Sequence, residues 1–225
     1  MRLANRPADG LALIFDMDGV IVHSNPLHSE SWKAFNRRFG RETTPAMIAG
    51  MFGKRNDDIV REWYGASLSE EEVTRRGADK ERLYREMAAG RVEDMLMPGL
   101  RKFLDRHRGA PMAVASNAEP ENIDFVLDEA ALWPYFRSVL NGHMVGRPKP
   151  FPDIYLLAAE RLGAKPGNCV VFEDSYSGVK AARAANMRVV GIRSSHSEIS
   201  GCDFAVDNFL SEDLETWLST QSPVA

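Results

Sequence analysis

The sequence predicts an α/β protein with a doubly wound, Rossmann-like, mostly parallel sheet and an inserted α-helical domain. Four short apolar runs, none of which alternates with polar residues, indicate strands that are buried on both faces. Helix-like segments lie between these runs, and this alternation favours a parallel sheet. One long stretch, residues 27–93, contains no such run and shows only helical periodicity.

Each apolar run ends in polar or charged residues. The runs are Leu11–Phe15, Pro111–Ala115, Asn168–Phe172 and Met187–Ile192. They are followed by Asp16-Met-Asp-Gly19, Ser116-Asn117, Glu173-Asp174 and Arg193-Ser194. Right-handed crossovers place the C-terminal ends of parallel strands along one edge of the sheet, where such folds bind ligands. We therefore expect these polar residues to converge on one site.

Helices that cover the sheet follow or precede the strands. They are expected at Gly99–His107, Glu119–Ala131, Asp153–Leu162 and Ser177–Asn186, and a short final strand and helix follow Ser200. Together with the strands they assign residues 1–26 and 94–225 to an α/β core.

Residues 27–93 are expected to form a second, smaller domain, which we call the cap. One helical stripe contains His28, Trp32, Phe35 and Phe39, and Pro45–Met51, Asn56–Tyr64 and Ser69–Ala89 continue the helical pattern. Ser69-Glu-Glu-Glu72 is a capping-box signature for the start of the longest of these helices.

Composition excludes several classes of protein. The chain has 225 residues, a net charge of −4 and two cysteines. It shows no basic run of the kind that binds a phosphate backbone, and no apolar stretch long enough to span a membrane. The N-terminal Met1–Gly10 lacks the apolar region of a signal peptide, and Cys169 and Cys202 have no metal-binding spacing. We expect a cytoplasmic monomer that binds neither nucleic acid nor membranes.

The acidic residues at two strand ends suit a divalent cation. Asp16 and Asp18 are two residues apart in extended backbone, so both carboxylates can face one site. Glu173 and Asp174 supply further carboxylate oxygens from another strand end. Hard oxygen ligands without nearby histidine or cysteine favour Mg²⁺.

Other residues suit a phosphoryl group. Lys149 lies between Pro148 and Pro150, which restrict its backbone and suit a lysine held in place. Ser116 offers a hydroxyl and Asn117 a backbone N–H group at a third strand end. Phosphoryl transfer needs mostly positioning and charge neutralisation, which this set of groups provides.

The four motifs Phe15-Asp-Met-Asp-Gly-Val20, Ala115-Ser-Asn117, Arg147-Pro-Lys-Pro150 and Phe172-Glu-Asp-Ser175 resemble the ordered motifs of the haloacid dehalogenase superfamily. The inserted helices resemble the cap of the branch that contains β-phosphoglucomutase and many sugar-phosphate phosphatases. The resemblance implies that Asp16 is a nucleophile forming an aspartyl-phosphate and that Asp18 is the general acid and base. It further implies that Ser116 and Lys149 hold the phosphoryl oxygens, and that Mg²⁺ is bound by Asp16, the backbone carbonyl of Asp18 and Asp174, with Glu173 assisting.

Three residues of the cap are candidates for substrate binding. His28 resembles the histidine that supports the acid–base aspartate in a phosphohexomutase, and the alternative is a helix-face histidine that packs against Trp32. Lys80 resembles a lysine of the mutase cap that contacts substrate, and the alternative is a solvated lysine on a charged helix. Arg55, in the loop Phe52-Gly-Lys-Arg-Asn56, is a candidate for binding a second phosphate, although its alignment needs a shift of one residue.

Three functions remain open at this stage. The first is Mg²⁺-dependent hydrolysis of a small phosphomonoester, a sugar phosphate, and the second is a phosphohexomutase like β-phosphoglucomutase. The third is a phosphate-binding regulatory module without turnover, although such a binder would not need both a nucleophile and a proton donor. The carboxylate of Asp18 argues against dehalogenation, because dehalogenases of the superfamily lack it. The expected partner is a small phosphorylated metabolite.

Overall fold

Residues 10–221 are described by a computed structural model, so residues 1–9, most of the segment considered for a signal peptide, and residues 222–225 lie outside it. Six strands form one sheet in the order β3-β2-β1-β4-β5-β6, and every strand pairing among the described residues is parallel. The strands are β1 (Ala12–Phe15), β2 (Met112–Ala115), β3 (Ser138–Leu140), β4 (Cys169–Glu173), β5 (Arg188–Ile192) and β6 (Phe204–Val206). The predicted parallel α/β sheet is thus confirmed.

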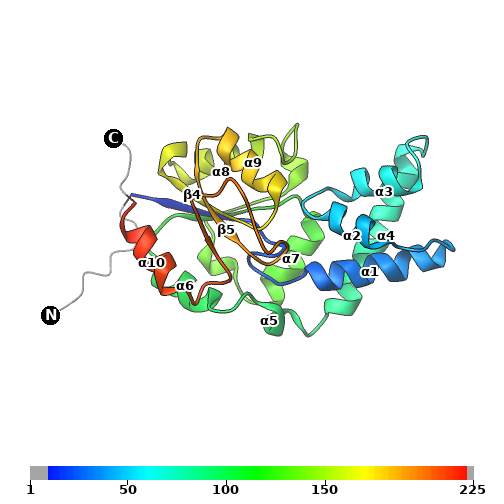
Figure 1. Ribbon diagram of the computed structural model, residues 1–225, viewed down its shortest axis with the longest axis horizontal. Helices are drawn as coiled ribbons and strands as arrows, with labels where there is room; N and C mark the ends of the chain where they lie inside the picture. The colour runs from blue at the N-terminus through cyan, green and yellow to red at the C-terminus, as the bar shows by residue number, and fades with distance from the viewer. Residues whose placement is uncertain (1–9, 222–225) are drawn as a thin grey trace.

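Helices cover both faces of this sheet (Figure 1). One face packs against α8 (Asp153–Leu162) and α9 (Tyr176–Ala184), and the other against α6 (Leu100–Arg106), α7 (Pro120–Glu129) and α10 (Glu212–Ser219). Alternate side chains of β1 enter the two cores: Phe15 stacks on Phe172 with ring centroids 4.8 Å apart, whereas Ile14 packs under α8 and α9. Burial on both faces explains why the strands read as uninterrupted apolar runs.

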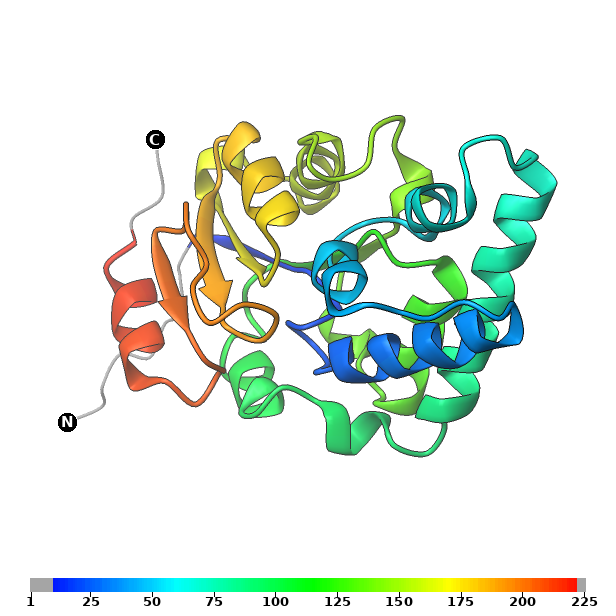
Figure 2. The same cartoon turned by 45° about the vertical axis from the view of Figure 1, so that its right-hand side comes forward.

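Four helices lie together beyond one end of the sheet (Figures 1 and 2). They are α1 (Asn25–Arg38), α2 (Pro45–Met51), α3 (Asn56–Tyr64) and α4 (Glu70–Ala88). They enclose their own apolar cluster around Trp32, Phe35 and Trp63, whereas Phe39 is 43% exposed. At the start of α4, the Ser69 hydroxyl accepts a hydrogen bond from the Glu72 amide, as the capping signature predicts.

Two chain crossings connect these helices to the sheet, and they bond to each other. The His23 amide donates to the Met95 carbonyl at 2.7 Å, and the Met97 amide donates to the Ile21 carbonyl at 2.9 Å. Met95 is the last residue of α5 (Val92–Met95). The two crossings therefore lie side by side and are joined by backbone hydrogen bonds.

Helices α1 and α5 each cross one of the two expected domain boundaries, since α1 begins at Asn25 and α5 spans Val92–Met95. The division into a core and a cap stays a prediction. Strand β3 was not predicted, because its three residues at the edge of the sheet are too short for a periodicity signal. In the described part of the chain, the helices are all too short or too polar to traverse a lipid bilayer.

Candidate active site

The carboxyl ends of β1, β2 and β4 carry the polar residues expected to converge. Asp16 directly follows β1, Ser116 directly follows β2, and Glu173 and Asp174 end β4 and continue it. A cavity between this sheet edge and the cap is lined by side chains of both. The parallel topology thus places the cavity where the strand ends meet.

Lys149 lines this cavity and contacts two of the carboxylates. Its Nζ is 2.7 Å from Asp16 Oδ1 and 2.6 Å from Glu173 Oε1, and its side chain is 2% exposed. Burial alone would lower the pKa of Lys149, but the two carboxylates outweigh burial and raise it. The ammonium group therefore stays charged beside the strand ends.

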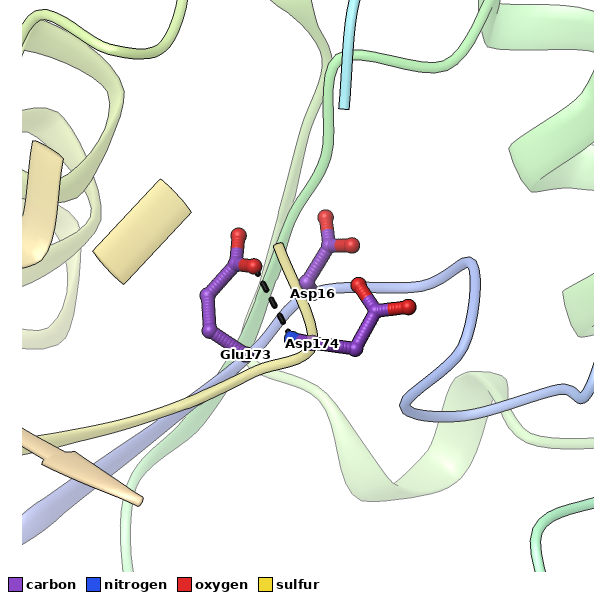
Figure 3. A group of neighbouring side chains, drawn as sticks. All are labelled: Asp16, Glu173 and Asp174. Carbon is purple, nitrogen blue, oxygen red and sulfur yellow. Dashed lines mark hydrogen bonds between the residues drawn. The ribbon is translucent and has the colours of Figure 1, made fainter. Parts of the chain in front are cut away.

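Asp16, Glu173 and Asp174 form a buried group of carboxylates (Figure 3). One ligand oxygen from each lies within 4.8 Å of the others. Burial raises the pKa of Asp16 from 3.8 to about 7, although Lys149 opposes the rise. Burial, and after it the charge of Glu173, raises the pKa of Asp174 well above its ordinary value. Burial also acts to raise the pKa of Glu173, but Lys149 outweighs it and the pKa is lowered.

This electrostatic arrangement fits a divalent cation. Asp16 ionises at a cost even beside Lys149, as does Asp174, and a divalent cation between them would offset that cost. The group contains only carboxylate oxygens, which is the donor chemistry that Mg²⁺ takes. The side chain of Glu173 is turned towards Lys149 and Ser175, so Asp16 and Asp174 are the oxygens nearer the cavity.

The Asp174 carboxylate is fixed by Ser194, which follows a predicted strand end, and by two residues that the sequence analysis did not name, Asn25 and Ser195. Its Oδ2 accepts hydrogen bonds from Asn25 Nδ2 at 2.9 Å, from Ser194 Oγ at 3.0 Å and from the Ser195 hydroxyl. Gly19, with φ of +79°, approaches so closely that a Cβ there would lie 1.8 Å from the same oxygen. Glycine is therefore required at this turn for both its backbone conformation and its lack of a side chain.

Asp18 is held from the cap side. Its Oδ1 accepts a hydrogen bond from Ser24 Oγ at 2.5 Å and lies 3.2 Å from His28 Nε2. The other ring nitrogen of His28, Nδ1, is 2.7 Å from Lys80 Nζ, and the ring stacks on Tyr84 at 3.8 Å between centroids. Burial acts to raise the pKa of Asp18, but the interactions with His28, followed by the bond from Ser24, outweigh it and lower the pKa.

The structure brings most of the predicted site residues to one cavity, with two exceptions: Glu173, which is turned towards Lys149 and Ser175, and Arg55. The predicted residues that line it are Asp16, Asp18, His28, Lys80, Ser116, Asn117, Lys149 and Asp174. Arg55 does not line the cavity: its Nη2 lies 3.2 Å from Nδ1 of His143 in the 3₁₀ helix Gly142–Met144. Lys80 is 1% exposed and is thus not a solvated lysine.

Asn117 joins the sheet edge to the cap. Its side-chain amide donates to the Gly53 carbonyl at 3.1 Å, while Oδ1 accepts from the Lys149 amide at 3.4 Å. The Ser116 hydroxyl accepts from the Ala118 amide at 3.1 Å and is available to donate into the cavity. The cap loop at Gly53 therefore rests directly on the strand end that carries these two residues.

Sequence reasoning missed Asn25, Asn56, Glu81 and Asn122, which also line the cavity. The serines beside Asp174 carried a usable signal, because Ser194 follows a predicted strand end. No sequence signal marks Glu81 or Asn122, because their contact joins two helices that are far apart in the sequence.

Comparisons with known proteins agree with this geometry. A family model described as haloacid dehalogenase-like hydrolase matches residues 11–186. The fructose-1-phosphate phosphatase YqaB of Escherichia coli is 35% identical over 184 residues, which cover 80% of this chain and 95% of that protein. A phosphorylated carbohydrates phosphatase of Thermotoga maritima is 32% identical over 188 residues, covering 80% of this chain and 84% of that protein.

Solved structures share the fold. The crystal structure of β-phosphoglucomutase from Clostridium difficile aligns with a TM-score of 0.81 at 24% identity, covering 92% of this chain and 96% of that one. Because the family model spans both the cap and the strand ends described above, the chain belongs to the haloacid dehalogenase-like hydrolase family.

Proposed function

We propose that this enzyme is a phosphatase that hydrolyses a sugar phosphate through an aspartyl-phosphate on Asp16. The observation that carries the proposal is the pairing of two carboxylates in one cavity with opposite surroundings: Asp16 beside the Lys149 ammonium, and Asp18 held by hydroxyl and imidazole groups. Lys149, together with a bound cation, would favour the ionised carboxylate that a nucleophile needs at Asp16, whereas Oδ2 of Asp18, to which no described residue donates, suits proton transfer.

The proposed reaction has two steps. In the first, an Asp16 oxygen attacks phosphorus, the bond to the sugar oxygen breaks, and Asp18 gives a proton to that oxygen. The negative charge of the bound phosphate would favour the protonated form of Asp18, which His28 and Ser24 disfavour without substrate. In the second, Asp18 takes a proton from water as the water attacks phosphorus, and the Asp16 carboxylate and inorganic phosphate are released. Lys149 and the Ser116 hydroxyl hold the phosphoryl oxygens.

We propose Mg²⁺ as the cofactor, held by Asp16, Asp174 and the backbone carbonyl of Asp18, with Glu173 orienting Lys149 and thereby assisting. When bound, Mg²⁺ would supply charge neutralisation for the phosphoryl oxygens. The proposed division into a core of residues 1–26 and 94–225 and a cap of residues 27–93 gives the cap a gating role, in which it admits the substrate and then excludes bulk water.

The charges that line the cavity favour hydrolysis over mutase chemistry. A mutase passes through a bisphosphate and needs a cationic site for the second phosphate. Among the described residues that line the cavity, each lysine already faces a carboxylate: Lys54 faces Glu62 at 2.5 Å, Lys80 faces Glu81 at 2.8 Å, and Lys149 faces two. Arg55, the candidate for that role, points outside the cavity.

The relatives and the mixed polar and apolar lining of the cavity support a sugar phosphate as the substrate. Apolar side chains of Trp32 and Ile59 line the cavity together with the polar groups described above. Apolar faces suit the carbon skeleton of a sugar. Two relatives carry names of phosphatases of phosphorylated sugars. The second candidate stays the phosphohexomutase, favoured by the contact between His28 and Lys80.

A phosphate-release assay tests the proposal. The purified protein is incubated with fructose 1-phosphate, glucose 6-phosphate, β-glucose 1-phosphate and p-nitrophenyl phosphate, each with Mg²⁺ and with EDTA. We expect Mg²⁺-dependent release of phosphate from at least one sugar phosphate and none from the Asp16→Asn variant. Conversion of β-glucose 1-phosphate to glucose 6-phosphate in the presence of a trace of glucose 1,6-bisphosphate, without phosphate release, would establish the mutase instead. A folded protein that binds Mg²⁺ but turns over no compound would support the binding module.

A further inference from the structure

Glu81 is a buried carboxylate that the proposed reaction does not use. It lies on α4 directly after Lys80, and its side chain is 5% exposed. Its Oε1 accepts hydrogen bonds from Lys80 Nζ at 2.8 Å and Asn56 Nδ2 at 2.7 Å, while Oε2 accepts from Asn122 Nδ2 at 2.6 Å. Three donors on one buried carboxylate hold it in a single orientation.

One of these three donors comes from the other side of the cavity. Asn122 belongs to α7, which packs on the sheet, whereas Glu81 and Asn56 belong to the cap. Asn122 is 1% exposed, and its Oδ1 accepts a further hydrogen bond from Arg85 Nη1 at 2.7 Å. Glu81 and Arg85 of the cap thus both bond to the side-chain amide of Asn122 in the core. These contacts exist only while the cap lies against α7.

Glu81 is linked to Asp18 through two further contacts. The Lys80 ammonium can only donate, so His28 Nδ1 must accept its hydrogen bond at 2.7 Å. The ring proton of a neutral His28 is then on Nε2, which donates to Asp18 Oδ1. Ser24 bonds to the same oxygen, so Oδ2 of Asp18 is left for proton transfer. Glu81 supplies the counter-charge that lets a buried ammonium take this place.

We propose that Glu81 is a positioning residue that couples closure of the cap to the orientation of Asp18. In the closed arrangement Asn122 completes the set of donors to Glu81, which then fixes Lys80 and, through it, the tautomer and ring position of His28. Opening the cap removes Asn122, so the proton donor is correctly oriented only when the cavity is shut. The inference rests on the proposed role of Asp18 as the general acid.

Leaving groups of different basicity provide the test. A sugar alkoxide needs a proton as it leaves, whereas p-nitrophenolate leaves without one, so a fault in the general acid lowers kcat/KM for sugar phosphates selectively. Because kcat/KM covers only the steps up to formation of the aspartyl-phosphate, the later hydrolysis does not obscure the comparison. The substrates are p-nitrophenyl phosphate and the sugar phosphate of the panel above with the highest kcat/KM.

The variants separate positioning from stability of the cap. Glu81→Gln removes the charge at nearly constant volume, and Asn122→Ala removes the donor from the core. Arg85→Ala is the matched control, because it also breaks a bond between the cap and Asn122 but does not touch the Glu81 carboxylate. Asp18→Ala marks the full loss of the general acid, and thermal melting of each variant checks that it is folded.

We expect Glu81→Gln and Asn122→Ala to lower kcat/KM about tenfold or more for the sugar phosphate but less than about threefold for p-nitrophenyl phosphate, within the range of roughly 10²–10⁴ that a general acid contributes. Arg85→Ala stays within about threefold on both substrates, since it leaves the carboxylate and its donors in place. An equal loss on both substrates, or a selective loss in Arg85→Ala that matches Asn122→Ala, would overturn the proposal. Asp18→Ala without selectivity, or a wild type that hydrolyses neither compound, would instead contradict the proposed function.

Discussion

Replacing the nucleophile by its amide should make the metal-free protein more stable. Asp16→Asn keeps an oxygen that accepts from Lys149 Nζ, which lies 2.7 Å from Asp16 Oδ1, but removes a carboxylate that is costly to ionise in its buried place. The pKa of Asp16 rises from 3.8 to about 7 on folding. At about 1.4 kcal/mol per pKa unit, this rise corresponds to about 4 kcal/mol.

The sign of the pH dependence follows from the two pKa values. Below pH 3.8 the carboxyl group is protonated in both states and contributes nothing. As the pH rises from there towards 7, the unfolded chain releases the proton while the folded protein retains it, so wild-type stability falls. Above pH 7 the full penalty is present. The asparagine variant escapes this penalty because it has no carboxyl group at this position.

The assay is urea denaturation in EDTA, followed by tryptophan fluorescence. We expect Asp16→Asn to be about 2–4 kcal/mol more stable than the wild type at pH 8, and within about 1 kcal/mol of it at pH 4. Asp58→Asn, at an exposed position of the cap, is the control and should show no such gain. Added Mg²⁺ should narrow the gap by stabilising the wild type. Equal or lower stability of Asp16→Asn at pH 8 would show that ionised Asp16 does not destabilise the metal-free protein.

Three further substitutions test other parts of the site. Gly19→Ala forces a Cβ to within 1.8 Å of Asp174 Oδ2 at a φ of +79°, so Mg²⁺ affinity measured by calorimetry should fall about 10–100-fold, and unchanged affinity would contradict this packing. Lys149→Met leaves the buried carboxyl groups of Asp16 and Glu173 without a cationic partner and should lower the free energy of unfolding by about 3–5 kcal/mol at pH 8 in EDTA. A loss below about 1 kcal/mol would show that these two ion pairs contribute little to stability. Arg55→Ala should leave phosphate release within about threefold of wild type, because the guanidinium lies outside the cavity, and a loss of about tenfold would place it in the site.

The fold could be predicted from the sequence where strands are buried on both faces of the sheet. Strands such as Leu11–Phe15 are covered on both faces, so their residues read as unbroken apolar runs, and the topology then brings Asp16 to Glu173 and Asp174 without any further information. The three-residue edge strand at Ser138–Leu140 could not be predicted, because so short a segment shows no detectable hydrophobic periodicity.

Site residues at strand ends could be predicted from the sequence, but the positions of the cap side chains could not. Arg55 precedes α3 in a loop, and spacing along the sequence does not determine that its side chain turns towards His143. The contact of Glu81 with Asn122 depends on how α4 rests on α7, a tertiary arrangement that no local pattern encodes. Helical periodicity placed His28 and Trp32 on one stripe, but Trp32 enters the cap cluster while His28 faces Asp18.

Trapping of the phosphoenzyme tests whether Asp16 is the nucleophile. The protein is mixed with Mg²⁺ and a phosphomonoester carrying ³²P, quenched in acid within the first turnover, digested and mapped by mass spectrometry. We predict that the label lies on the peptide that contains Asp16 and is absent from the Asp16→Asn variant. Turnover without a labelled peptide, or label on any residue other than Asp16, would exclude Asp16 as the nucleophile.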